Sequence, residues 1–249
     1  MTRLPYDLSM DMAPRVGLIV LQADETIEDE FRHLLPDSVS CLVSRVPSGL
    51  AVTPETLRAM EGHLTKAAAL FPSSAQFAAV GYACTSGTAE IGTERIAELV
   101  HAGTQTAAVS EPVTALIEAC RALSATRLGL VSPYVATVSD RLRAVLRTAD
   151  IETPRFASFD EPLEANVARI DETSVVRAAI AMGRDAACDA VFLSCTNLRT
   201  RAAIPVIEAA IGKPVLSSNL VLAWHLCRLA GVDPDKTVPS QLFQASNAD

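Results

Sequence analysis

Short apolar runs alternate with longer amphipathic stretches along most of the chain. Apolar runs of four to eight residues are typical of buried strands, and apolar positions three and four apart are typical of helices. The pattern predicts strands at residues 15–21, 39–46, 77–83, 106–110, 127–134, 154–159, 189–195 and 213–218. It predicts helices at residues 26–35, 53–71, 93–101, 111–124, 136–150, 172–187, 204–210 and 219–231. Strands separated by helical crossovers predict mostly parallel sheets with helices on both faces.

The order of these elements repeats once. Cys84 follows Gly17 of the first predicted strand by 67 positions, and Cys195 follows Gly129 of the fifth by 66. We therefore predict an α/β protein of two pseudo-symmetric lobes with the active site in the cleft between them. The predicted parts are an N-terminal extension (1–14), a first lobe (15–124) to which helix 219–231 returns, a second lobe (125–232) and a C-terminal tail (233–249).

Each half places a Cys-Thr pair where its third strand ends, in "YACTSGTAE" (82–90) and "FLSCTNLRT" (192–200). Ligands of parallel sheets bind just beyond the carboxyl ends of the strands. Two facing lobes would put Cys84 and Cys195 on opposite walls of one cleft. Two such thiols can take a proton from one side of a planar intermediate and return it on the other, provided that their pKa values fall from about 8.5 toward neutrality. This chemistry needs no cofactor.

Composition and charge narrow the class of protein. The 249 residues are 49% hydrophobic and 20% charged, which is typical of a globular chain. The net charge of −8 argues against a nucleic-acid partner. No apolar stretch is long enough for a membrane span, and the N-terminus does not read as a secretory signal, so we expect a cytoplasmic protein. Zinc-type cysteine spacing and the G-x-G-x-x-G fingerprint are absent from the sequence.

Five segments carry a resemblance to a known family: "GLIVLQADETIEDE", "GYACTSGTAEIG", "GLVSPYVATVSDRL", "EANVARI" and "FLSCTNLRT". Together they resemble the aspartate/glutamate racemase superfamily, and within it the branch of maleate cis–trans isomerases and arylmalonate decarboxylases. The resemblance covers residues 15–232. Because both cysteines are present, the chain looks less like the decarboxylases, which keep only the second.

The resemblance implies roles for individual residues. Cys84 would be the nucleophile or base, and Cys195 its acid/base counterpart. Tyr134 and Asn166 would hydrogen-bond the substrate carboxylate. The carboxylate cradles would be formed by Thr85, Ser86, Thr196 and Asn197. The family also implies a homodimer that acts on a small carboxylate without metal or cofactor.

The first loop departs from the family. Where the family usually reads Pro-Ser-Ser-Asn-Thr, this chain reads "LQADET" (21–26), with Asp24 in the place of a carboxylate-binding asparagine. An ionised Asp24 would repel a substrate carboxylate, and it would accept a hydrogen bond from an ammonium or hydroxyl group. Asp24 could equally be only the cap of the following helix.

Several functions therefore stay open. The first is a maleate-isomerase-like reaction with Cys84 and Cys195. The second is racemisation of aspartate, glutamate or a diaminobutyrate derivative, as in ectoine degradation, by the same two residues. A decarboxylase that uses only Cys195 is a third, and a catalytically inactive carboxylate-binding protein is a fourth. In the last case both cysteines would be ordinary buried residues at strand ends.

Overall fold

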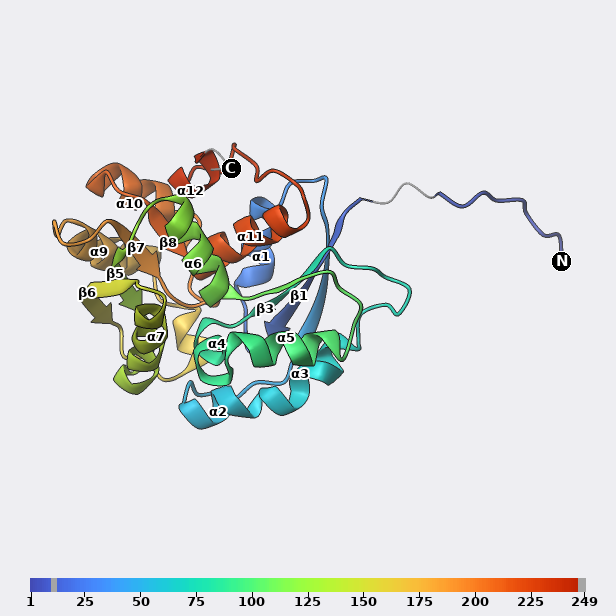
Figure 1. Ribbon diagram of the computed structural model, residues 1–249, viewed down its shortest axis with the longest axis horizontal. Coiled ribbons are helices and arrows are strands. Elements are labelled where there is room, and N and C mark those ends of the chain that lie inside the picture. The colour runs from blue at the N-terminus through green and yellow to red at the C-terminus, as the bar shows by residue number, and fades with distance from the viewer. Residues whose placement is uncertain (10–12, 246–249) are drawn as a thin grey trace.

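The computed structural model describes residues 1–9 and 13–245 (Figure 1). Two four-stranded parallel sheets form its framework, with strand orders β2-β1-β3-β4 and β6-β5-β7-β8. The strands are β1 (Arg15–Leu21), β2 (Ser40–Val46), β3 (Ala79–Ala83), β4 (Val109–Ser110), β5 (Arg127–Ser132), β6 (Glu152–Ser158), β7 (Ala190–Leu193) and β8 (Val215–Ser217). The second sheet repeats the order of the first, which confirms the predicted two-lobed α/β fold.

The central strands are the most apolar because both of their faces are covered. All residues of β3 and β7 are buried, and so are all but the first residues of β1 and β5. The edge strands β2 and β6 expose several side chains. Strands β1, β3, β5 and β7 take the two central positions of their sheets. The carboxyl ends of β3 and β7 therefore lie near the middle of their sheets.

Helices cover both sheets. They are α1 (Ile27–Leu34), α2 (Pro54–Ala59), α3 (Glu61–Ala68), α4 (Thr85–Ile91), α5 (Thr93–His101), α6 (Pro112–Ala122), α7 (Ala136–Thr148), α8 (Glu164–Val167), α9 (Glu172–Gly183), α10 (Ala203–Ile211), α11 (Ser218–Leu229) and α12 (Gln241–Gln244). Thr53 caps α2 through a capping box, as its position before Pro54 predicts. The single helix expected over 53–71 is divided at Met60 into α2 and α3.

Three short helices are additions to the predicted pattern. α4 follows Cys84 directly, α8 lies in the loop after β6, and α12 lies in the segment expected as a tail. α12 buries Leu242 and Phe243 in the core, so this part of the C-terminal segment is packed. Residues 10–12 of the expected N-terminal extension and residues 246–249 of the tail lie outside the described residues.

The last long helix joins the two lobes. α11 begins at the end of β8 in the second sheet and packs its Leu222 and Leu226 against Gly81 of β3 in the first. A side chain at position 81 would meet the two leucines at 3.5 and 3.1 Å, so glycine permits this close contact. In Figure 1, α11 and α6 lie side by side above the first sheet.

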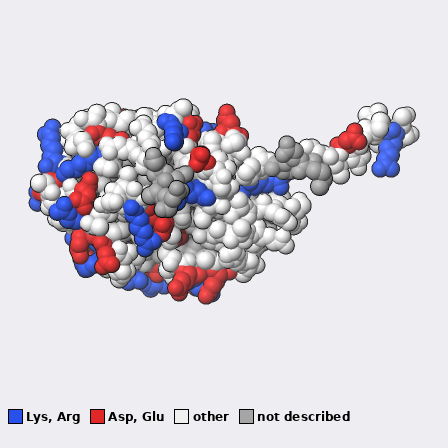
Figure 2. All heavy atoms as spheres, turned by 45° about the horizontal axis from the view of Figure 1, so that its top comes forward, with Lys and Arg blue, Asp and Glu red and all other residues white. Residues whose placement is uncertain are grey.

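The surface carries charges of both signs. On the face in Figure 2, Lys and Arg side chains are interspersed with Asp and Glu. Exposed ion pairs such as Arg95–Glu61 join surface charges of opposite sign. Within the described residues, no helix has the length and apolar character required to cross a membrane.

Candidate active site

Cys84 lies at the junction of β3 and α4. Its backbone is extended (φ −153°, ψ 111°), and its Sγ accepts a hydrogen bond from the Gly87 N–H at 3.2 Å, so the thiol itself caps α4. The Ser86 hydroxyl lies 3.7 Å from the same sulfur. A side chain at Gly87 would lie 2.9 Å from Cys84 Sγ and 2.5 Å from the Tyr82 hydroxyl, so this position requires glycine.

Cys195 follows β7 in a different conformation. Its φ of +118° is a backbone region that side-chain-bearing residues seldom adopt, at a cost of about 1–3 kcal/mol. The Cys195 N–H donates to Ser218 Oγ at 3.0 Å, which helps to hold this conformation. The neighbouring Ser194 hydroxyl is buried without a hydrogen-bond partner among the described residues. Such strain is most often found at functional positions.

Hydrogen bonds between the lobes bring the two cysteine loops together. The Thr85 and Ser218 hydroxyls lie 2.7 Å apart, and Ser218 also accepts from the Cys195 N–H. In the other direction, the Thr196 hydroxyl donates to the Ala83 carbonyl at 3.3 Å. Thr85 is therefore tied to Ser218 of α11, which also holds Cys195, and Thr196 is tied to the residue before Cys84. The two Cys-Thr pairs thus form one buried unit.

Each sulfur also has a tyrosine beside it. The fully buried Tyr82 precedes Cys84 by two positions, and its hydroxyl lies near Cys84 Sγ and 3.6 Å from Met60 Sδ. The Tyr134 hydroxyl, from the loop after β5, lies near enough to the Cys195 sulfur to lower the pKa of that thiol. Tyr134 also lies close enough to Cys84 for the charge of that thiolate to raise the tyrosine pKa. The two thiols thus face one small group of side chains.

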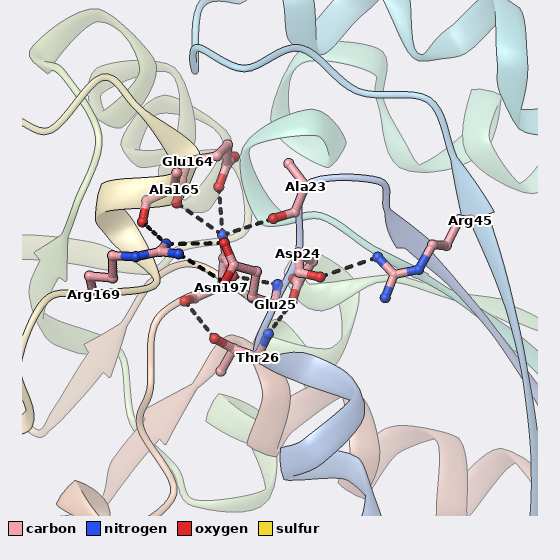
Figure 3. A network of polar contacts seen from close by, with 9 residues as sticks. All are labelled: Ala23, Asp24, Glu25, Thr26, Arg45, Glu164, Ala165, Arg169 and Asn197. Atoms are coloured by element: carbon pink, nitrogen blue, oxygen red, sulfur yellow. Dashed lines mark hydrogen bonds and ion pairs between the residues drawn. The ribbon is translucent and has the colours of Figure 1, made fainter.

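Asp24 and Glu164 form a second part of the site, and Asn197 joins them (Figure 3). The Asn197 amide nitrogen donates to the Ala23 carbonyl and to both the main-chain oxygen and Oε2 of Glu164, the last at 3.1 Å. Its amide oxygen accepts from the Glu25 N–H at 2.9 Å. Asn197 therefore holds the loop after β1 against α8. Both ends of its side-chain amide are engaged in these contacts.

Asp24 bonds the start of α1 but is not its N-cap residue, which is Thr26, two positions later. Its Oδ1 accepts from the N–H groups of Thr26 and Ile27 at 2.8 and 2.9 Å. Its Oδ2 is buried and makes no hydrogen bond of good geometry with the described residues, although the Thr196 hydroxyl is near enough to lower the Asp24 pKa. The Asp24 carboxylate therefore uses Oδ1 to bind the start of α1, and its Oδ2 is left without a hydrogen bond of good geometry.

The structure does not bring Asn166 into this group. Asn166 is exposed on α8, whereas Glu164, two positions earlier, is buried beside Asn197. The spacing of apolar residues explains the difference, because Glu164, Val167 and Ala168 share the inward face of a helical turn. Helical periodicity over "EANVARI" would have selected Glu164 in place of Asn166.

Burial dominates the electrostatics of the site. It raises the pKa of Cys84 to about 12, while the Gly87 N–H lowers this pKa and the Glu164 charge raises it further. Burial also raises the Cys195 pKa, to which the charges of Glu164 and Asp24 add, and against which Tyr134 and the Asn197 N–H act. Burial raises the pKa of Glu164 to about 6, again with a contribution from Asp24. Each cysteine is only 3% exposed, and the raised pKa values favour the thiol form of both at neutral pH.

The structure also adds residues that the sequence interpretation did not select. Tyr82 could have been found from strand alternation, which places it on the same face of the chain as Cys84. Ser218 follows directly after the last strand of the second sheet, at the same edge as Cys195. Among the described residues, no group of three or more His, Cys, Asp or Glu side chains is arranged to hold a metal ion.

Comparison with known proteins decides the family. Residues 16–243 match the arylmalonate decarboxylase family. The chain belongs to this family. It is 23% identical over 234 residues to the maleate isomerase of Pseudomonas putida, an alignment that covers 88% of this chain and 93% of that protein. It is 27% identical to the maleate isomerase of Geobacillus stearothermophilus, covering 86% and 90% of the two chains.

Solved structures of the same family share the fold. A liganded double mutant of arylmalonate decarboxylase superimposes with a TM-score of 0.83 at 28% identity, covering 94% of this chain and all of the other. A Cys-to-Ser mutant of the Nocardia farcinica maleate cis–trans isomerase, with a covalently bound succinylcysteine intermediate, gives a TM-score of 0.79 at 24% identity, covering 94% and 99%. The maleate isomerases that align with nearly the whole chain identify it as an isomerase of this family.

Proposed function

We propose that this protein is a cofactor-independent isomerase of small carboxylates that uses Cys84 and Cys195 as a pair. The observation that carries the proposal is the single buried unit formed by the two cysteine loops, with one tyrosine beside each sulfur. The equivalent positions of the cysteines in two repeated sheets support it further, because a substrate between the lobes would have one sulfur on each side.

In a cis–trans reaction the steps balance without any other reactant. Cys84 first releases its proton to solvent. The resulting thiolate adds to one carbon of a substrate double bond, and the adjacent carbon, activated by its carboxylate, takes a proton from the Cys195 thiol. Rotation about the resulting single bond follows. The Cys195 thiolate then removes the proton and the carbon–sulfur bond breaks, which restores the double bond and both cysteines. The succinylcysteine intermediate in the Nocardia enzyme is an adduct of this kind.

A racemase reaction is the second candidate, and Asp24 and Glu164 favour it. In that reaction one thiolate removes the proton from the substrate α-carbon and the opposite thiol donates a proton to the other face. The two buried carboxylates lie where a group with hydrogen-bond donors, such as an α-ammonium group, would be stabilised and a second carboxylate would be repelled.

Proton NMR in D2O separates the two reactions. The wild type is incubated with maleate and, separately, with single enantiomers of aspartate, glutamate and 2,4-diaminobutyrate. Conversion of maleate to fumarate identifies the isomerase, and exchange of deuterium into the α-position with loss of optical activity identifies the racemase. Cys84→Ser and Cys195→Ser should each reduce the active reaction by about 1,000-fold or more.

Cys41→Ser is the matched control, because Cys41 lies on the edge strand β2 away from both loops. It should leave the rate within about twofold of wild type. Full activity in either of the two site variants would refute a two-cysteine reaction. Release of CO2 from an arylmalonate by Cys84→Ala would instead identify a decarboxylase that depends on Cys195 alone.

A further inference from the structure

Two buried carboxyl groups near the thiols have no buried positive partner among the described residues. Asp24 is 5% exposed and Glu164 is 6% exposed, and each lies near enough to Cys195 for its charge to act on that thiol. Asn197 holds the residues on either side of Asp24 against Glu164, so the two carboxyl groups belong to one surface. We call this surface, formed by Asp24 and Glu164, the acidic wall.

Asp24 is the residue of this wall that points to a ligand. One carboxylate oxygen accepts from the N–H groups of Thr26 and Ile27 at the start of α1, and the other is buried without a hydrogen-bond partner among the described residues. A buried carboxylate oxygen left unpaired is costly, and such groups are nearly always satisfied by a partner, a water molecule or a ligand. An N–H or O–H group of a bound substrate would satisfy it.

The arginines near the acidic wall are engaged elsewhere (Figure 3). Arg45 donates to the main-chain oxygens of Leu21 and Asp24 and pairs with Glu28. Arg169 pairs with Glu25 at 3.0 Å, and its side chain is 59% exposed. Arg45 lowers the Asp24 pKa, but burial has the larger effect and raises it. Both arginines therefore neutralise acids at the surface, and neither is bonded to the Asp24 or Glu164 carboxylate.

We propose that the acidic wall is a subsite for a substrate ammonium group, so that the substrate is an amino-carboxylate and not a diacid without an amino group, such as maleate. The inference rests on the proposed function only for the location of the substrate between the thiols. In this arrangement the ammonium group donates to Asp24 Oδ2 and to Glu164. The substrate carboxylate lies at the other end, toward Tyr134 and the Cys195 loop.

An ammonium group in this place would also act on the thiols. The charges of Glu164 and Asp24 oppose ionisation of Cys195, and that of Glu164 opposes ionisation of Cys84. A bound cation would offset both charges, and the pKa values of the two thiols would then fall toward the range in which they exchange protons with carbon. The correct substrate would thus help to activate its own catalytic residues.

Binding of two unreactive probes tests the subsite. Succinate and 4-aminobutyrate are both four-carbon chains without a double bond or a stereocentre, and they differ in one end group, a carboxylate or an aminomethyl group. Isothermal titration calorimetry at pH 8 should give a dissociation constant at least tenfold lower for 4-aminobutyrate in the wild type. In the Asp24→Asn/Glu164→Gln variant the order should reverse, with succinate bound more tightly.

Glu25→Gln is the matched control. Glu25 lies in the same loop, but its side chain is exposed and pairs with Arg169. Removing its charge should change the preference by less than twofold. An equal shift in this variant would mean that the preference comes from the general negative charge of the loop, and it would overturn the subsite.

The pH dependence of wild-type binding is a second test that needs no variant. As pH falls from 8 to 5, Glu164 with its pKa of about 6 gains a proton, whereas 4-aminobutyrate keeps its ammonium group. The other ionisable groups that face Glu164 are Asp24, the two thiols and Tyr134. The dissociation constant of 4-aminobutyrate should therefore rise at least fivefold over this range. Succinate is not used in this test, because it gains a proton over the same range.

The outcome is separable from that of the proposed function, since neither probe undergoes the reaction. Wild-type protein that binds succinate as tightly as 4-aminobutyrate, or binds neither probe, overturns the subsite even if both cysteines prove essential for turnover of maleate. A tenfold preference for 4-aminobutyrate that disappears in the double variant supports the subsite even if Cys84→Ser and Cys195→Ser retain activity.

Discussion

The two lobes share a strand order, yet they present their cysteines in different ways. Cys84 has an ordinary extended backbone and caps the helix that follows it, whereas Cys195 has a φ of +118° and depends on Ser218 from α11. The loops after the first strand of each sheet also differ, because one carries Asp24 and the other Tyr134. The repeated scaffold places two sulfurs symmetrically, and the loops then give the two ends of the site different chemistry.

The two thiols differ in which parts of the chain contact them. Cys84 is held by its own helix through Gly87, Ser86 and the neighbouring Tyr82. Cys195 is held by groups from other elements, namely Tyr134 and Ser218. Local changes should therefore disturb Cys84, and changes in distant parts of the sequence should disturb Cys195.

The largest effect is expected for Gly87→Ala. The added methyl group would lie 2.5 Å from the Tyr82 hydroxyl and 2.9 Å from Cys84 Sγ, so the sulfur must move. A displacement of about 1 Å at a reacting group can reduce kcat about 100-fold. Steady-state kinetics would measure the loss. Gly62→Ala on α3 is the control, because a side chain there meets nothing within 4 Å, and wild-type kinetics are expected.

The tyrosines test whether the two thiols can be perturbed separately. Tyr134→Phe removes the hydroxyl that lowers the Cys195 pKa, and Tyr82→Phe removes the one beside Cys84. Loss of one such hydrogen bond should reduce kcat about 10- to 100-fold, with a smaller change in KM. Tyr82→Phe should move the rising limb of the pH–rate profile, which reports formation of the Cys84 thiolate, to higher pH. Tyr134→Phe should move the falling limb at high pH, which reports loss of the proton of the Cys195 thiol, to higher pH. If Tyr134→Phe left this limb in place, Cys195 would not be the group that titrates there.

Ser218→Ala tests the bridge between the lobes. It leaves the buried Cys195 N–H and the Thr85 hydroxyl without this partner. We expect a loss of about 2–3 kcal/mol in the free energy of unfolding, measured by urea denaturation, together with lower activity. Ser73→Ala, at an exposed position, should change the stability by less than about 0.5 kcal/mol. Equal effects of the two substitutions would show that the bridge adds no stability.

The smallest effect is a gain in stability in Glu164→Gln. The Glu164 pKa is raised from 4.5 to about 6, so the folded protein binds this proton more tightly than the unfolded chain, and the ionised form destabilises the fold. The penalty is absent below about pH 4.5 and complete above pH 6, where it reaches about 2 kcal/mol. Glutamine still accepts a hydrogen bond from Asn197.

Thermal unfolding at pH 4.5 and pH 8 would measure this gain. The Tm of Glu164→Gln should exceed that of wild type at pH 8 and match it at pH 4.5. The exposed Glu94→Gln should have little effect at either pH. A variant less stable than wild type at pH 8 would mean that the ionised carboxylate is a net stabilising group.

Much of the architecture could be predicted from the sequence because the strands are continuous apolar runs and most helices have a clear apolar stripe. β1, α1, α7 and α11 lie within a few residues of their predicted ranges. α4 was missed for a physical reason. Its first five residues are all buried and are mostly small or polar, so the helix has no exposed face and no amphipathic period.

The candidate site was predictable where it follows from the end of a strand. The positions of Cys84 and Cys195 followed from the repeat, and the structure places both in one unit. The choice between Asn166 and Glu164 required knowledge of a four-residue helix, and the side-chain role of Asn197 required knowledge of which loop faces it. Contacts between segments far apart in the sequence, such as Thr85 with Ser218, cannot be predicted from the local pattern of apolar and polar residues.

The burial of the two sulfurs has a consequence for the lifetime of the enzyme. Oxidation of cysteine to sulfenic acid needs both access for the oxidant and thiolate character, and the closed site denies both. The substrate must enter through a more open arrangement, and in that moment peroxide can enter too. Inactivation by peroxide should therefore follow the fraction of time that the lobes are apart, and a tightly bound competitive inhibitor should protect the protein from it.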